Sequence, residues 1–340
     1  MRAAIYDPYL DTLGGGERYV MTVAQVLIEN GWNVDVEWGE DEIKNKLENR
    51  LGIDLSKVKI VKNINKGQGY DLVFWLSDGS VPNLSAKKNI LHFQVPFHYV
   101  NGKSLFNRLK LRKINSVVCN SNFTKQFIDR EYGVNSVVIY PPVDVASFKP
   151  LKKENIILSV GRFSQLLQAK RQDVLVDTFK KMIDGGLKGW KLILAGGSDV
   201  GGKEIVENLR EESAGYNIEI KENPDFNQLK NIYGKAKIFW SASGFEINEE
   251  KNPQKVEHFG ITVVEAMSAG CVPIVFAAGG HREIVNGTNG YLWEDIDQLI
   301  DDTNKVIRND KNRVILSEKA LEDSNKYGYE RFKEDFLQII

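Results

Sequence analysis

The sequence of 340 residues predicts an α/β protein made of two doubly wound domains. Short runs rich in β-branched residues alternate with longer amphipathic segments, which is typical of parallel sheets built from βαβ units. The alternation starts near the N-terminus and starts again at about residue 154, and each time the first strand runs into a loop that contains glycine. Two separate parallel sheets are the simplest explanation of this restart.

The elements follow in order. In the first half, strands are predicted over 3–7, 32–38, 57–62, 71–76, 89–94, 116–121 and 136–142, and a helix over 17–31. After the restart, strands are predicted over 155–162, 191–198, 218–222, 238–243 and 272–277, with helical segments over 172–186, 228–236 and 260–270. A glycine closes several of the helical segments, as expected of a helix terminus.

The domain boundary is predicted near Pro141 and Pro142, in the stretch YPPVDVASFKP, which has three prolines and no periodicity. We therefore expect an N-terminal Rossmann-like domain over 1–145 and a C-terminal one over 146–322. The segment 323–340 carries aromatic and aliphatic residues at helical spacing, and we expect it to pack back on the first domain.

Composition excludes several classes of function. The formal net charge is -1, so no global positive field attracts nucleic acid. The two cysteines, Cys119 and Cys271, lie in apolar runs, which argues against a disulfide framework or a thiolate metal site. The start of the chain lacks the apolar stretch of a signal peptide, and no run approaches the roughly 20 apolar residues of a membrane span. A cytoplasmic protein is predicted.

A glycine loop, DTLGGGER, lies between the first strand and the first helix. Glycines such as Gly15 and Gly16 let a backbone approach a ligand, and the N–H groups of the following helix turn favour an anion. The spacing is not the G-x-G-x-x-G of dinucleotide sites, which weakens a dehydrogenase interpretation. A flexible turn without a ligand explains the loop equally well.

Cations follow the first strand of the second domain. Arg162 comes directly after this strand, and Lys170 and Arg171 precede the next helix. Because the carboxyl ends of parallel strands face the ligand crevice, a guanidinium and an ammonium there suit a diphosphate. The competing interpretation is that they are solvated surface cations.

Two glutamates, Glu257 and Glu265, are separated by seven residues in EHFGITVVEAMSAG. Glu257 falls in the loop before a predicted helix, and Glu265 falls inside that helix. An acid in the first turns of a helix can simply complement the helix dipole. However, Glu265 on an otherwise apolar helix needs hydroxyl partners.

Histidine is scarce, and His92 ends a predicted strand of the first domain, where a structural role is commoner than a catalytic one. No grouping of histidines and acids has metal-ligand spacing. The basic segment 102–115 contains Lys103, Arg108, Lys110, Arg112 and Lys113 among Leu105, Phe106 and Leu109. It is either an ordinary solvated helix face, which the charge pattern favours, or a peripheral contact with an anionic membrane surface or a phosphorylated acceptor.

Together these motifs resemble the family 4 glycosyltransferases, which are retaining enzymes of the two-domain GT-B fold. The resemblance covers nearly the whole chain. It rests on LGGGER, VVCNSNFTKQFI, YGVNSVVIYPPVD, VGRF followed by a lysine, EHFGITVVEAMSAGCVPIV and GGHREIV. The EHFGI variant is also similar to mannosyltransferases of lipid-linked oligosaccharide assembly. The resemblance implies two Rossmann-like domains facing a central cleft, with the acceptor on the N-terminal side and the nucleotide sugar on the C-terminal side.

The resemblance also implies roles for individual residues. Glu265 would hold the ribose hydroxyls, and Glu257 and His92 would lie by the donor sugar. The remaining contacts would be made to the diphosphate and sugar hydroxyls by the side chains of Arg162 and Lys170 and by the backbone of Gly15, Gly16, Phe259, Gly260, Ile261 and Thr262. Because the family often has fewer residues between the arginine and the lysine, Lys170 and Arg171 remain alternatives. Glu246 and Glu249, in a long acidic loop before the pair, are either ligands or surface residues.

The implied function is a retaining, metal-independent hexosyltransferase without a cofactor. It would move a hexose from GDP-mannose or a UDP-sugar to a hydroxyl of a glycan or lipid-linked glycan. A non-catalytic nucleotide-sugar-binding member of the family and a GT-B epimerase or phosphorylase are the alternatives.

Overall fold

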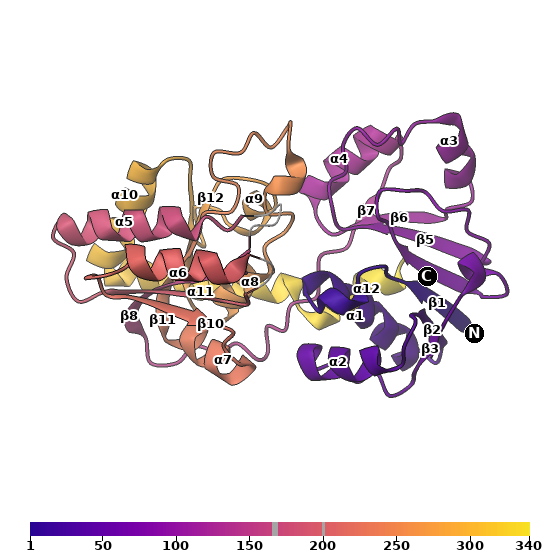
Figure 1. The fold of residues 1–340 in the computed structure, drawn as a ribbon, viewed down its shortest axis with the longest axis horizontal. Helices are drawn as coiled ribbons and strands as arrows, with labels where there is room; N and C mark the ends of the chain where they lie inside the picture. The colour runs from indigo at the N-terminus through magenta and orange to yellow at the C-terminus, as the bar shows by residue number, and fades with distance from the viewer. Residues whose placement is uncertain (165–168, 199–200) are drawn as a thin grey trace. The chain divides into compact units, whose positions relative to one another are not determined.

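The computed structural model describes residues 1–164, 169–198 and 201–340, and they form two compact units (Figure 1). The first unit contains Met1–Pro142 together with Tyr329–Ile340, and the second contains Val143–Gly328. Residues 165–168, part of the predicted cation segment, lie outside the described residues.

The described residues of the first unit form a parallel sheet of seven strands in the order β3-β2-β1-β4-β5-β6-β7. The strands are β1 (Arg2–Tyr6), β2 (Asn33–Glu37), β3 (Val58–Val61), β4 (Leu72–Leu76), β5 (Lys88–Phe93), β6 (Ser116–Cys119) and β7 (Val137–Val138). The helices are α1 (Gly15–Glu29), α2 (Glu42–Leu51), α3 (Leu105–Leu111), α4 (Asn122–Tyr132) and α12 (Tyr329–Leu337), with 3-10 turns η1 (Leu10–Thr12) and η2 (Asn65–Gly67).

The second unit repeats this plan with a parallel sheet of six described strands in the order β10-β9-β8-β11-β12-β13. They are β8 (Glu154–Val160), β9 (Lys191–Gly196), β10 (Ile218–Glu222), β11 (Ala236–Ser241), β12 (Val272–Phe276) and β13 (Tyr291–Trp293). The helices are α5 (Gln172–Asp184), α6 (Gly202–Glu212), α7 (Phe226–Lys235), α8 (Ile261–Ser268), α9 (His281–Ile284), α10 (Ile296–Arg308) and α11 (Asp310–Ser324), with 3-10 turns η3 (Pro253–Lys255) and η4 (Asn325–Tyr327).

The predicted fold class is confirmed, because both sheets are parallel and each is wound in two directions from its first strand. The predicted strands occur where the β-branched runs lie. The run 136–142 is an exception, since only Val137–Val138 pair there and prolines follow. The structure adds β13, which the sequence did not indicate because it has only three residues.

The C-terminal helix α12 belongs to the core of the first unit. Phe332 and Phe336 are buried there, and the Phe332 ring meets Tyr19 of α1 edge-on at a centroid distance of 4.9 Å. The ammonium of Lys333 lies 2.6 Å from the carboxylate of Glu29. Among the described residues, no helix has both the length and the apolar composition that a bilayer crossing requires.

Each sheet reverses its strand order beside its first strand, between β1 and β4 and between β8 and β11. Open α/β sheets bind ligands outside the carboxyl ends of the strands at such a point. The loops that follow β1, β8, β11 and β12 begin at the carboxyl ends of these strands. We therefore expect the ligand-binding residues in these loops.

Candidate nucleotide-sugar site

Three loops meet at the carboxyl edge of the second sheet, because β8, β11 and β12 are adjacent and parallel. The loop after β8 carries Arg162, and the loop after β11 extends from Ala242 to Gly260 and carries Glu257. The loop after β12 carries Gly279 and Gly280. The predicted residues of the second unit are thus gathered at one edge, although more than 100 positions separate them along the chain.

Lys170 and Glu257 form an ion pair at the centre of this edge. The ammonium nitrogen lies 2.6 Å from a carboxylate oxygen, and the two side chains are only 19% and 15% exposed. Gly161 makes room for the lysine, since a Cβ atom there would lie 2.8 Å from Cγ of Lys170. The lysine therefore extends across the end of β8, next to Arg162, which is itself exposed.

The ion pair determines the protonation of Glu257. Burial on its own would raise the pKa of this carboxyl, but the charge and hydrogen bond of Lys170 outweigh burial and hold the pKa well below its usual range. Glu257 is consequently ionised at neutral pH. A paired charge at a ligand site is already partly dehydrated and fixed in position, which suits it to a charged ligand.

Arg171 points elsewhere. Its backbone φ is +49°, so the side chain leaves the chain in a different direction from that of Lys170. The guanidinium lies 3.0 Å from Glu246 and 3.2 Å from Asp173, and it sits 5.4 Å above the centroid of the Phe245 ring. The structure thus gives Arg171 and Glu246 a common role in fixing the loop after β11, whereas Lys170 meets Glu257.

The backbone before α8 has a conformation that requires glycine. Gly260 has φ of +121°, which L side chains rarely adopt, and α8 begins at the next residue. The side chain of Phe259 is buried and meets the Tyr327 ring at 5.2 Å, so only its backbone can reach a ligand. Ile261 and Thr262 form the first turn of the helix, where unpaired N–H groups favour an anion.

Gly279 and Gly280 pack directly against this segment. A Cβ atom on Gly279 would lie 2.1 Å from the carbonyl oxygen of Glu257, and one on Gly280 would lie 2.4 Å from Cα of Phe259. The N–H of Gly280 donates to the Glu257 carbonyl at 2.8 Å. The two glycines therefore fix the backbone position of Glu257.

Glu249 has a bracing role in the same loop. One carboxylate oxygen accepts the N–H of Gly279 at 2.9 Å, and the other lies 2.5 Å from the guanidinium of Arg282. The acidic stretch before Glu257 thus ties the loop after β11 to the loop after β12. Glu246 and Glu249 thus both make contacts that hold the loop after β11, which carries Glu257.

Glu265 lies one turn into α8 and is held by a residue that the sequence did not single out. The hydroxyl of Tyr233, on α7, donates to Glu265 at 2.9 Å. Tyr233 is fully buried, and burial together with the neighbouring Glu265 raises its pKa well above the usual value. The phenol therefore stays protonated and keeps one oxygen of Glu265 in place.

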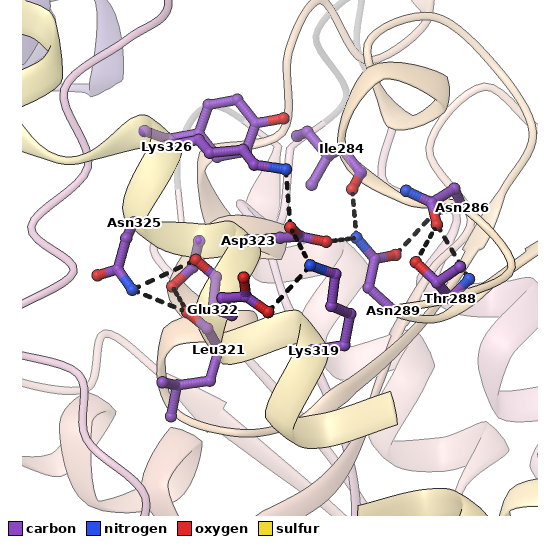
Figure 2. Close-up of polar contacts among 12 residues, drawn as sticks. Ile284, Asn286, Thr288, Asn289, Lys319, Leu321, Glu322, Asp323, Asn325 and Lys326 are labelled. Carbon is purple, nitrogen blue, oxygen red and sulfur yellow. Dashed lines mark hydrogen bonds and ion pairs between the residues drawn. The ribbon is translucent and has the colours of Figure 1, made fainter. Parts of the chain in front are cut away.

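Helix α9, which follows the two glycines, is anchored from α11 and η4. Figure 2 shows the buried carboxylate of Asp323 beside Lys319, Lys326 and Asn289, at 3.3, 2.7 and 3.0 Å. The same Asn289 amide donates to the carbonyl of Ile284 at the end of α9. Burial would raise the pKa of Asp323, but its hydrogen-bonding partners lower it, so the anchor is charged at neutral pH.

In the first unit, the glycine loop leads into α1. The N–H of Gly14 donates to Glu17 at 2.5 Å, which closes the start of the helix. Gln94, after β5, donates to the carbonyl of Gly16 at 3.1 Å, and a Cβ atom on Gly16 would lie 2.4 Å from the Gln94 side-chain oxygen. A side chain at Gly16 would therefore displace the end of the Gln94 side chain, while Gly15 is exposed. A role of either in binding a ligand remains a prediction.

His92 lies in β5 and is fully buried in the first unit. Its ring stacks on Tyr19 at a centroid distance of 4.1 Å, and Nδ1 lies 3.1 Å from the carbonyl oxygen of Val118. Burial lowers the pKa of His92 to about 3, so the ring is neutral. This environment favours the structural interpretation of His92 over a catalytic one.

The described residues contain no group of three or more His, Cys, Asp or Glu side chains placed to hold a metal ion. Cys119 and Cys271 are both buried as free thiols, one in each unit.

Comparison with known proteins agrees with the resemblance to glycosyltransferases seen in the sequence. The family described as glycosyl transferases group 1 matches residues 144–323, just over half of the chain. The GDP-Man:Man(3)GlcNAc(2)-PP-Dol alpha-1,2-mannosyltransferase of Dictyostelium discoideum is 27% identical over 239 residues, which are 64% of this chain and 45% of that protein. The protein of the same name from Mus musculus is 26% identical over 313 residues, 84% of this chain and 58% of that protein. The chain spans about half the length of the curated relatives that it matches.

Among solved structures, Anabaena Alr3699/HepE in complex with UDP has a TM-score of 0.77 at 17% identity, with 99% of each chain covered. At this level of identity the likeness shows the fold. The two Rossmann-like domains of this chain have the GT-B fold.

Proposed function

Because the chain belongs to the glycosyl transferases group 1 family, we propose that it transfers mannose from GDP-mannose to a hydroxyl of a glycan or lipid-linked glycan. We further propose that the anomeric configuration is retained and that no metal takes part. The observation that carries the proposal is the Lys170–Glu257 ion pair at the edge of the second sheet, directly before the N-terminus of α8.

The reaction breaks the bond between the anomeric carbon and the β-phosphate oxygen and forms a bond from that carbon to the acceptor oxygen. The acceptor proton passes to the departing phosphate oxygen, so no separate protein base is required. The barrier comes from negative charge that accumulates on the diphosphate while the sugar becomes oxocarbenium-like. Fixed positive charge near the diphosphate therefore accelerates the step.

Lys170, Arg162 and the first N–H groups of α8 supply this charge in the proposal. Lys170 is already desolvated and oriented by Glu257, so it needs little reorganisation when the diphosphate arrives. Glu257, beside it, accepts hydrogen bonds from sugar hydroxyls. Glu265, held by Tyr233 one turn further along α8, accepts them from the ribose.

The choice of donor follows the relatives. The curated relatives named above are designated GDP-Man transferases that act on a dolichol diphosphate glycan. We therefore expect GDP and GDP-mannose to raise the melting temperature more than UDP, UDP-glucose or ADP at equal concentration, since stabilisation grows with the logarithm of ligand over Kd. A larger shift with a UDP-sugar would overturn the choice of donor while leaving the transfer reaction open.

The role of Lys170 is tested by turnover of labelled GDP-mannose with a lipid-linked glycan acceptor. Loss of one preorganised charge costs about 3 kcal/mol of transition-state stabilisation, so Lys170→Ala should lower kcat roughly 100-fold. The double variant Lys170→Ala/Glu257→Gln removes the buried charge that the single variant leaves unpaired. If the double variant folds like the wild type and is still slow, an unpaired buried charge does not explain the slow turnover, and the loss belongs to the Lys170–Glu257 pair.

A matched control is Lys188→Ala, an exposed lysine between α5 and β9 of the same unit, which should leave turnover unchanged. Wild-type turnover by Lys170→Ala at saturating donor would refute the role of Lys170 in the reaction.

Two further measurements test the retention of configuration and the absence of a metal. NMR of the product should show an α-mannoside, and a chelator such as EDTA should leave the rate unaltered. A β-mannoside, or a rate restored only by added metal, would contradict those parts.

A further inference from the structure

The segment between Gly79 and Ile128 contains no Asp or Glu in 50 residues, yet it contains eight Lys and Arg. The whole chain has a formal net charge of -1, so this block is a local positive region on a nearly neutral protein. Five of the eight cations, Lys103, Arg108, Lys110, Arg112 and Lys113, lie within eleven residues in and around α3.

Helix α3 (Leu105–Leu111) has an apolar face that no part of the described chain covers. None of its residues is buried, and Leu105, Phe106 and Leu109 are 76%, 79% and 57% exposed. Leu111 is half-buried and packs on the core cluster that contains Val81 and Leu91, so this side of the helix faces the domain. The three exposed side chains therefore point outward together. Figure 1 shows α3 at the rim of the first unit, apart from α1 and α2.

The helix is held firmly in this position. Ser104 caps it by accepting the N–H of Asn107 at 3.3 Å. Glu131 of α4 accepts N–H groups from Val100 and Gly102 in the preceding loop, at 3.0 and 3.3 Å. The exposed face is therefore a defined surface rather than a frayed segment.

The cations around this face are not neutralised by the described residues. Lys110 donates to the carbonyl of Val81 at 2.8 Å and Lys113 to the amide oxygen of Asn83 at 2.9 Å, both of which are uncharged acceptors. The nearby carboxylates of Glu131 and Asp129 are engaged with backbone N–H groups and Lys125. The apolar stripe thus carries a net positive border.

We propose that α3 and its basic border form a docking surface for an anionic lipid bilayer. Leu105, Phe106 and Leu109 would enter the boundary between head groups and acyl chains, while the cations meet anionic head groups. A second copy of the chain is a poor occupant, since a symmetric contact would place five cations against five others. The proposal concerns binding alone and does not depend on turnover.

The test is flotation of the full chain with vesicles. Wild-type protein should float with phosphatidylcholine vesicles that contain 30% phosphatidylglycerol, in the way of an interfacial helix with a basic border, and should stay unbound with pure phosphatidylcholine. Raising the salt concentration from about 50 to 500 mM should weaken binding, because exposed charges are screened.

Two variants separate the apolar and the charged contributions. Leu105→Ser/Phe106→Ser should abolish flotation, and Arg108→Glu/Arg112→Glu should weaken it at least about 30-fold, given roughly 1 kcal/mol for each cation near the surface. The matched controls lie in the second unit. Ile315→Ser removes an exposed apolar side chain of α11, and Lys188→Glu/Lys311→Glu makes the same change in net charge. Both controls should float like the wild type.

Circular dichroism of each variant establishes that it folds. The proposal is overturned if wild-type protein ignores anionic vesicles or binds neutral ones equally well. It is also overturned if Lys188→Glu/Lys311→Glu weakens vesicle binding as much as Arg108→Glu/Arg112→Glu does. Sedimentation that reveals a dimer dissolved by Leu105→Ser/Phe106→Ser would assign the face to a second copy instead.

Discussion

Asp7 and Glu257 are both buried carboxyls, yet their surroundings move their pKa values in opposite directions. Lys170 keeps Glu257 ionised. Asp7, at the end of β1, accepts only the N–H of Tyr9 at 2.8 Å, and its second oxygen is buried without a hydrogen-bonding partner among the described residues. Burial, with a contribution from the neighbouring Glu17, raises the pKa of Asp7 to about 7. The neighbouring cation therefore accounts for the opposite directions in which these two buried carboxyls are shifted.

The raised pKa of Asp7 predicts a pH dependence of stability. Between the ordinary value near 4 and about 7, the folded chain holds a proton that the unfolded chain has lost, so the free energy of unfolding falls as pH rises through this window. Asp7→Asn keeps the acceptor for Tyr9 and removes the titration. In urea unfolding, the variant should match the wild type near pH 4 and exceed it by roughly 2–4 kcal/mol at pH 8.

Asp301→Asn controls for the change in net charge, since Asp301 is an exposed carboxylate of α10 in the second unit. Parallel stability curves for Asp7→Asn and the wild type between pH 4 and 8 would contradict the burial of an uncharged acid at this position.

At the scale of elements, the site depends on loop backbones that touch. Gly279→Ala would place a Cβ atom 2.1 Å from the carbonyl oxygen of Glu257, so the loop after β12 must move away from the loop after β11. We expect a loss of about 1–3 kcal/mol in stability and at least a tenfold loss in kcat/KM, because Glu257 and the start of α8 shift with it.

Gly186→Ala is the matched control for this change. Gly186 has φ of +102° in the same unit, and nothing lies within 4 Å of a Cβ atom placed there. It should lose about 1 kcal/mol through backbone strain alone and keep its turnover. Equal loss of activity in the two variants would show that general destabilisation, and not the contact with Glu257, is responsible.

Element types were largely predictable from the sequence, but contacts between elements were not. The β-branched runs located strands such as β8 and β12, because buried parallel strands are continuously apolar. The four-residue helix α9 and the three-residue strand β13 are too short to show periodicity. The pairing of Tyr233 with Glu265 and the buried environment of His92 depend on packing between distant segments, which leaves no local signal.

The contacts of two neighbouring cations in the site could not be predicted from the sequence either. Lys170 and Arg171 are adjacent in the sequence and chemically similar. Only the left-handed backbone at Arg171 directs one toward Glu246 and leaves the other beside Glu257. The resemblance to a family indicated that a cation belongs here, and the fold determined which of the two residues meets the glutamate.

At the scale of the whole molecule, one of the two units is built from two separate segments of the chain. The last helix, α12, completes the core of the first unit, so that unit needs both ends of the chain, while the second unit is continuous in sequence. Each unit has its own parallel sheet and its own apolar core. Damage to α12 should therefore weaken the first unit selectively.

Phe336→Ala tests this selectivity. Phe336 is fully buried against Phe74, with their ring centroids 6.0 Å apart, so its truncation should destabilise the first unit by about 3–5 kcal/mol. Hydrogen exchange followed by mass spectrometry of peptides should show faster exchange in β1, β4 and β5 and unchanged exchange in β8, β11 and β12. Phe226→Ala, at a half-exposed phenylalanine of α7, should leave both sheets protected. If Phe336→Ala accelerates exchange equally in the two sheets, the units unfold together, and the molecule is one cooperative structure despite its two cores.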